Sequence, residues 1–237
     1  MKNLAKIGLM SLSFAATAGD YQVTENPPAR GLVKDSFVVT YSANDFTDKI
    51  DEAKILFIPE NFRTQPAFLL RCRPYYTNFS VQFLETEKNL QDSDGTLTNE
   101  AASFAKHGYI YNADHDLTIS VGDQDESMEI LVGGQNKHLT QLFKTDLPKP
   151  AGLLGMSFYF TFNYKEMPSF RNAKNNSDTR DAYRLLKNAV QNQQPFILQL
   201  DGRNAPDRRF TLDSKRLNQA VPPEVIEFCL TGRELID

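Results

Sequence analysis

The stretch that decides the fold reads MSFYFTFNY and spans residues 156–164. One face of this stretch carries four aromatic side chains: Phe158, Phe160, Phe162 and Tyr164. A repeat of two residues is the period of a β-strand. Each buried ring removes roughly 150–250 Å² of surface from water, so we interpret the row as part of a core rather than as a ligand platform.

Alternating or short apolar runs predict strands along most of the remaining chain. We expect these strands over residues 36–41, 53–59, 67–73, 78–85, 109–112, 117–121, 127–132, 196–200, 209–212 and 224–230. Residues 74–77 predict a hairpin with a slightly long turn, and residues 122–125 predict a second turn.

One amphipathic helix is expected near the C-terminal third of the chain. Asp178 is its expected N-cap, and Pro195 places its end near Asn192. Its apolar stripe follows the i, i+3, i+4 spacing of a helix and comprises Ala182, Leu185, Leu186, Ala189 and Val190. Closely spaced strands with a single late helix predict a mainly β fold, namely an antiparallel β-sandwich.

Residues 1–18 have the three-part pattern of a secretory signal peptide. Lys2 and Lys6 precede an apolar run over residues 7–15, and small residues follow at 16–18. The run is far shorter than the ~20 residues that a membrane-spanning helix needs. We therefore expect residues 19–237 to form a single domain that is periplasmic or secreted from a bacterium. The alternative is a short N-terminal helix or strand of a cytosolic protein.

Composition and charge narrow the classes of partner. Hydrophobic residues make up 41% of the chain and charged residues 24%, which favours a folded core over disorder. Without residues 1–18 the chain keeps 24 basic and 30 acidic side chains, a formal charge of −6. Phosphate backbones and anionic lipids repel such a surface, so we expect no nucleic-acid partner. We also expect no integral membrane segment after signal cleavage.

The two cysteines, Cys72 and Cys229, are 157 positions apart. In an oxidising compartment an even pair indicates one disulfide, here expected between an early strand and the last one. The alternative is two separate buried thiols that act as small apolar residues.

No motif predicts a metal site or a cofactor. His115 lies between Asp114 and Asp116, but neighbours in a strand point to opposite faces, and we interpret this triplet as a solvated turn. The acidic turns at residues 92–95 and 122–126 lack the twelve-residue calcium pattern with glycine at its sixth position.

Two groups of side chains remain as candidate sites. Tyr75, Tyr76 and Tyr159 are the candidate partner surface of a binding or accessory module of the cell envelope, whose partner would be another envelope protein. The competing class is a hydrolase that uses carboxylates. Its candidate residues, which would have to converge in one pocket, are Asp114, Asp116, Asp123, Asp125 and Glu126. A third class is a structural subunit of an envelope assembly.

Parts of the chain resemble the TagO/VasI family of periplasmic accessory proteins from type VI secretion clusters. The resemblance lies in the segment SANDFTD (42–48), the strand FLLRCR (68–73) and the ending FCLTG (228–232). It implies a structural role for Cys72 and a location in the cell envelope. The chain departs from the family in having no tryptophan and no further cysteines.

Overall fold

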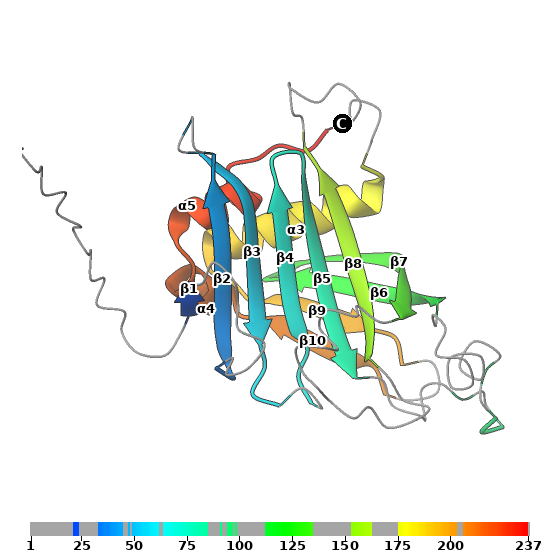
Figure 1. The fold of residues 1–237 in the computed structure, drawn as a ribbon. Helices are drawn as coiled ribbons and strands as arrows, with labels where there is room; N and C mark the ends of the chain where they lie inside the picture. The colour runs from blue at the N-terminus through cyan, green and yellow to red at the C-terminus, as the bar shows by residue number, and fades with distance from the viewer. Residues whose placement is uncertain are drawn as a thin grey trace, which may run out of the picture.

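The computed structural model describes residues 21–23, 33–44, 47, 49–61, 64–84, 91, 94–96, 98, 112–134, 153–162, 175–202 and 206–236. Figure 1 shows its elements, which in chain order are β1 (Tyr21–Val23), β2 (Ser36–Ala43), β3 (Ile50–Ile58), β4 (Ala67–Arg73), β5 (Tyr76–Leu84), β6 (Asn112–Val121), β7 (Gln124–Gly134), β8 (Leu153–Thr161), α3 (Ser177–Asn192), β9 (Phe196–Leu200), β10 (Arg208–Leu212), α4 (Ser214–Ala220), α5 (Pro223–Ile226) and η3 (Glu227–Thr231). The predicted mainly β character is confirmed. The predicted signal peptide, residues 1–18, lies outside the described residues.

All the described strands belong to one sheet, in the order β1-β2-β3-β4-β5-β8-β7-β6-β9-β10. The pair β1–β2 is parallel, and the other neighbouring pairs are antiparallel. The β4–β5 turn holds only Pro74 and Tyr75, because Arg73 already pairs with Tyr76. This turn is tighter than the four-residue one predicted. The β6–β7 turn is also short, and Gly122 adopts a φ of 59° there, which glycine accommodates without strain.

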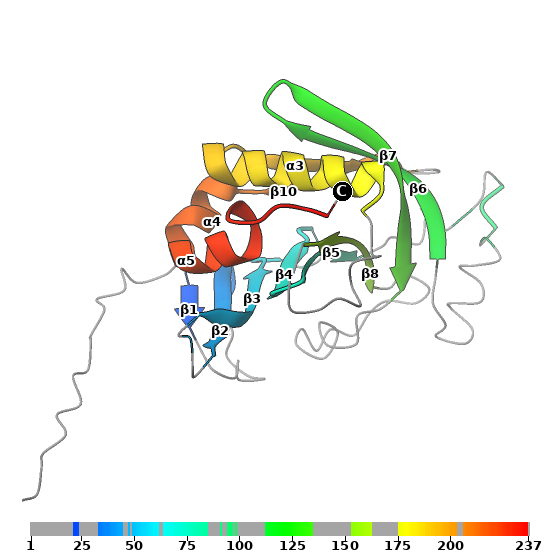
Figure 2. The same cartoon turned by 90° about the horizontal axis from the view of Figure 1, so that it is seen from above.

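The sheet forms a curled half-barrel, so the predicted β-sandwich is wrong. Figure 2 shows the sheet curving around α3, which makes the second layer of the core helical. Only two residue pairs join β7 to β8, namely Gly133–Gly155 and Gly134–Leu154. A Cβ on Gly155 would lie 3.1 Å from the carbonyl oxygen of Val81 on β5, so glycine permits the close approach of β8 to β5 beside this corner. Side-chain alternation shows which face of a strand is buried, but one curled sheet and two stacked sheets give the same alternation.

The inner face of the sheet packs against the apolar stripe of α3. Phe158, Phe160 and Phe162 are buried as predicted, while Tyr164 lies outside the described residues. The five predicted stripe residues of α3 are also buried. The N-cap is Asn176 rather than Asp178, since the Asn176 side chain accepts a hydrogen bond of 2.8 Å from the backbone N–H of Thr179. A cap residue precedes the helix, so Asp178 instead places its carboxylate in the first turn.

The chain over residues 223–231 is helical, which corrects the strand predicted there. α5 continues directly into the π-helical turn η3. The buried residues of this segment are Val225, Ile226, Cys229 and Leu230. Their i, i+1, i+4, i+5 spacing is that of a helix face, and a proline in the first turn favours helix initiation. Val225 and Ile226 favour strands by residue type, but the spacing of the buried positions outweighs that preference.

Cys72 and Cys229 form a disulfide with a Cα–Cα distance of 5.2 Å, as predicted. It joins β4 to η3, not one strand to another. Hydrogen bonds reinforce this connection: the Thr77 hydroxyl donates to the carbonyl oxygen of Cys229 at 2.8 Å, and the Ile236 N–H donates to Thr161 at 3.1 Å. These bonds hold residues 229–236, which we call the C-terminal segment, at the edge of the core between α3 and the sheet.

Candidate functional site

The three tyrosines of the candidate partner surface lie side by side. Tyr75 stands in the β4–β5 turn, Tyr76 begins β5, and Tyr159 lies on the neighbouring strand β8. The ring centroids of Tyr75 and Tyr76 are 5.0 Å apart, and those of Tyr76 and Tyr159 are 6.1 Å apart. Tyr159 is 63% exposed, and the other two are partly buried. The structure therefore joins them into one continuous aromatic surface.

Next to these rings, three cations surround one carboxylate on the outer face of β3 and β4. The carboxylate of Glu52 lies 2.8 Å from Arg73 Nη2, 3.3 Å from Lys54 Nζ and 3.8 Å from Arg71 Nε. Lys54 and Arg71 are directly opposite each other in the sheet. The group carries a net charge of +2 on a chain whose net charge is −4.

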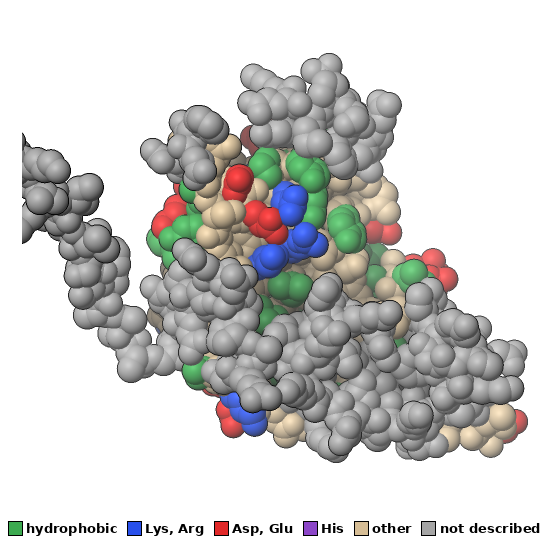
Figure 3. Space-filling view, in the orientation of Figure 1, with side chains coloured by type: hydrophobic (Ala, Val, Ile, Leu, Met, Phe, Trp, Pro, Cys, Tyr) green, Lys and Arg blue, Asp and Glu red, His purple; other side chains and the backbone are tan. Residues whose placement is uncertain are grey.

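Arg73 connects the charged group to the aromatic one. Partial desolvation lowers its pKa, but the Glu52 carboxylate and a side-chain hydrogen bond with Tyr75 outweigh that effect and raise the pKa above its ordinary value. Arg73 is therefore fully charged beside the rings. We call this set the outer-face patch: Glu52, Lys54, Arg71, Arg73, Tyr75, Tyr76 and Tyr159. Figure 3 shows basic side chains next to acidic ones on this face of the sheet, with hydrophobic side chains beside them.

The tyrosines of the outer-face patch were candidates from the sequence, but its cations were not. A signal for them existed in the chain. Arg71 and Arg73 flank the buried Cys72, so a strand places both arginines on the face opposite the core. The same alternation along β3 places Glu52 and Lys54 outward beside the buried Ala53.

The candidate hydrolase residues do not gather at one point. Asp114 pairs with Leu131, whereas Asp125 pairs with Ser120 six residues further along β6, which separates the two aspartates by roughly 20 Å. Glu126 points to the opposite face from Asp125 and pairs with Arg184 on α3 at 2.6 Å. Asp123 lies in the exposed β6–β7 turn, and Asp116 is exposed in the middle of β6.

His115 lies in the middle of β6, so the solvated turn predicted for residues 114–116 is wrong. Its side chain is buried, with the residue only 2% exposed, and Nδ1 lies 2.9 Å from a carboxylate oxygen of Asp201. Asp114 and Asp116 are exposed on the other face of the strand. The exposure of the triplet alternates as it does in a strand, with His115 buried and both aspartates exposed. The turn was predicted only because all three residues are polar. Within the part of the chain that the structure describes, no group of three or more His, Cys, Asp or Glu residues could hold a metal ion.

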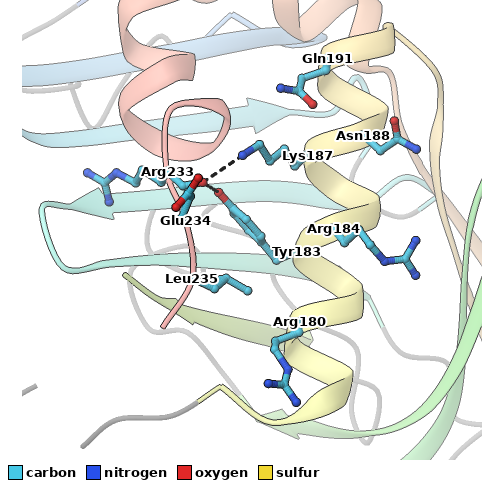
Figure 4. Close-up of a pocket in the computed structure, with 9 residues that line it drawn as sticks. All are labelled: Arg180, Tyr183, Arg184, Lys187, Asn188, Gln191, Arg233, Glu234 and Leu235. Carbon is cyan, nitrogen blue, oxygen red and sulfur yellow. Dashed lines mark hydrogen bonds between the residues drawn. The ribbon is translucent and has the colours of Figure 1, made fainter. Parts of the chain in front are cut away.

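A cavity of about 550 Å³ lies between α3 and the C-terminal segment (Figure 4). It is lined by Arg180, Tyr183, Arg184, Lys187, Asn188, Gln191, Arg233, Glu234 and Leu235. Figure 4 shows Tyr183 and Lys187 directed at the C-terminal segment and Arg184 directed away from it. Lys187 Nζ donates to the carbonyl oxygen of Arg233 at 3.0 Å. Arg184 is paired with Glu126 on the other side of the helix.

Tyr183 is the buried polar centre of this contact. Its hydroxyl lies 2.6 Å from the carbonyl oxygen of Leu230 and 2.8 Å from that of Arg233. Burial raises the pKa of Tyr183 above its ordinary value, and the nearby Arg233 offsets only part of this effect. Two of the side chains that line the cavity, Tyr183 and Lys187, thus serve to hold the C-terminal segment in place.

No protein-family model, no curated protein and no solved structure matches this chain. The described helices include none that is long and apolar enough to cross a membrane.

Proposed function

We propose that this protein is an exported binding module of the bacterial cell envelope, and that the outer-face patch binds another envelope protein. The observation that carries this proposal is the exposed Tyr159 ring, which continues through Tyr76 and Tyr75 to the Arg71–Arg73 cations. Tyrosine and arginine are the residue types enriched where binding energy concentrates in protein interfaces.

Charge indicates the chemistry of the partner. The cations of the outer-face patch exceed its single carboxylate by two, although the chain as a whole is acidic. An acidic surface on the partner would pair with Lys54, Arg71 and Arg73, and the rest of this chain would repel it. The outer-face patch therefore favours a partner protein whose contact surface carries acidic groups that pair with the cations and also packs against the tyrosine rings.

Three observations support export to an oxidising compartment. The N-terminal residues have the signal-peptide pattern, the chain holds a buried disulfide, and residues 42–85 resemble the periplasmic TagO/VasI proteins. Retention of Met1 in the mature protein, measured by intact mass, would contradict export. We expect the intact mass of a polypeptide that begins at Gly19.

Site-specific photocrosslinking in the source bacterium tests the binding surface. A photoreactive amino acid replaces Tyr159 in one variant and Leu131 in the other. Leu131 is the matched control, because it is a 53% exposed hydrophobic residue on the outer face of β7, outside the patch. We expect a discrete protein adduct at position 159 and none at position 131. Equal adducts at both positions would contradict a specific surface at Tyr159.

Affinity measurements with the purified partner complete the test. We expect Tyr159→Ser and Arg71→Glu each to weaken binding at least about tenfold, and Leu131→Ser to leave it unchanged. The Arg71→Glu effect should shrink in high salt, because it acts through charge. A partner whose affinity responds to none of the patch variants would rule out the outer-face patch as its binding site.

A further inference from the structure

A second site is indicated by Arg233, whose guanidinium is held in place but has few partners. It stacks between two rings, 4.2 Å from the centre of Phe228 and 4.8 Å from that of Phe162. Its Nη1 donates to the carbonyl oxygen of Arg73 at 2.6 Å. No carboxylate within the described part of the chain forms an ion pair with it. A guanidinium has five N–H donors, so most of them have no hydrogen-bond partner among the residues that the structure describes.

The position of Arg233 is unfavourable for an unpaired cation. Burial lowers the pKa of Arg233 to about 10, although the Tyr183 hydroxyl nearby offsets part of the effect. A half-buried cation costs free energy unless a negative group pairs with it. The two rings fix the plane of the guanidinium, which prepares it for a bidentate bond to a carboxylate.

Arg233 lines a cavity of about 810 Å³, within the size range of small-molecule sites. Figure 4 shows its side chain extending away from α3, on the far side of the C-terminal segment from the cavity beside the helix. The lining residues of the larger cavity are Asn44, Thr47, Lys49, Ile50, Asp51, Pro74, Glu224, Glu227, Phe228, Gly232 and Arg233. We call it the Arg233 cavity.

The walls of the Arg233 cavity carry both signs of charge beside apolar surface. Arg233 supplies the oriented cation, and Lys49 adds a second, exposed one. Glu224 and Glu227 supply two exposed carboxylates from α5 and η3. The carboxylate of Asp51 already accepts a hydrogen bond of 2.7 Å from the Ser42 hydroxyl. The apolar wall comprises Ile50, Pro74 and Phe228.

From this arrangement we propose that the Arg233 cavity binds a small zwitterionic molecule of the amino-acid or short-peptide class. Its carboxylate bonds to the Arg233 guanidinium, its ammonium group lies toward Glu224 and Glu227, and its apolar side chain packs against Phe228. A simple anion would meet repulsion from the two glutamates, and a simple cation would meet repulsion from Arg233 and Lys49. A molecule with both charges avoids both penalties.

Isothermal titration with L-leucyl-L-leucine tests the proposal on the full-length mature protein. Three further probes separate the contributions: L-leucine, N-acetyl-L-leucyl-L-leucine without the ammonium group, and hexanoate with the carboxylate alone. We expect the free dipeptide to bind at least about tenfold more tightly than the acetylated one and than hexanoate. The relative affinity of L-leucine then distinguishes an amino-acid site from a peptide site.

Two variants assign the contacts. Arg233→Gln should weaken dipeptide binding at least about tenfold, whereas Arg180→Gln, an exposed arginine on α3 that lines the other cavity, should not change it. Glu227→Gln should weaken the free dipeptide and strengthen the acetylated one. This opposite response is independent of any loss of stability in the Arg233 variant, because Glu227 is an exposed residue.

Three results would overturn the proposal. They are the absence of dipeptide binding at millimolar concentration, equal binding of hexanoate and the dipeptide, and a folded Arg233→Gln variant with unchanged affinity. The outer-face patch lies outside this cavity, so such results would leave the photocrosslinking experiment unaffected.

Discussion

At the scale of single residues, Tyr183 shows how one buried hydroxyl holds a segment of chain. The hydroxyl lies within hydrogen-bond distance of two carbonyl oxygens, those of Leu230 and Arg233. Its removal in Tyr183→Phe leaves these carbonyls with one partner fewer. We expect a loss of about 1–3 kcal/mol in the free energy of unfolding at neutral pH, measured by urea denaturation. Tyr159→Phe is the matched control, because the exposed Tyr159 should lose nothing.

The same residue predicts a dependence on alkaline pH. The folded state raises the pKa of Tyr183 above that of the unfolded chain, so the unfolded state loses this proton first as the pH increases. The stabilisation is therefore complete below the unfolded pKa of about 10 and declines above it. We expect the stability advantage of wild type over Tyr183→Phe to shrink between neutral pH and pH values above about 10. A constant difference across that range would contradict the role of this hydroxyl.

A second residue-scale prediction concerns two like charges on the outer face of β6 and β7. Asp116 and Glu129 are directly opposite each other, and both are exposed. Like charges at such positions destabilise a sheet, and opposite charges stabilise it. Glu129→Lys should raise the free energy of unfolding by about 0.5 kcal/mol in low salt. Glu129→Gln, which only removes the repulsion, should gain less, and high salt should reduce both gains.

At the scale of elements, the close packing of β8 against β5 depends on glycine. A methyl group on Gly155 would meet the backbone carbonyl of Val81 at 3.1 Å, and backbone yields less readily than the end of a side chain. We expect Gly155→Ala to destabilise the protein by about 1–2 kcal/mol in urea denaturation. Ser157→Ala, two residues further on the exposed face of β8, is the control and should change little. An equal response of both variants would show that the β5–β8 pairing tolerates a side chain at position 155.

Elements were predictable where local pattern and burial agree. The strand at residues 67–73 is predicted to the residue, since it is a short apolar run whose last four residues alternate between apolar and polar, and Pro66 and Pro74 bound it. The stripe of α3 is equally clear, because five apolar positions recur at helical spacing. The segment at residues 224–230 failed because its residue types favour a strand while its buried positions have helical spacing. In that segment the tertiary contacts, including the disulfide of Cys229, decide the outcome.

At the scale of the whole molecule, strand order is what the sequence could not supply. β5 pairs with β8, and β6 pairs with β9, so neighbours in the sheet are far apart in the chain. These pairings turn two expected sheets into one that curls around a helix. The outer-face patch has the same origin. Tyr75 lies in the β4–β5 turn, Tyr76 begins β5, and Tyr159 lies on β8. Only the pairing of β5 with β8 brings Tyr159 beside Tyr76. Residue types alone identify the tyrosines of such a surface, but the strand order decides which of them lie next to each other.

The curled sheet leaves one side of the core to be covered by α3, α4 and the C-terminal segment, and the disulfide fixes that cover to β4. The bond closes a loop of 157 residues, so its loss gives the unfolded chain much freedom. We expect Cys72→Ala with Cys229→Ala to lower the free energy of unfolding by about 4 kcal/mol, measured by urea denaturation. Both cysteines are fully buried, so reductant should break the bond in wild type only when denaturant is present. A loss below about 1 kcal/mol would show instead that the hydrogen bonds from Thr77 and Tyr183 hold the cover without the covalent link.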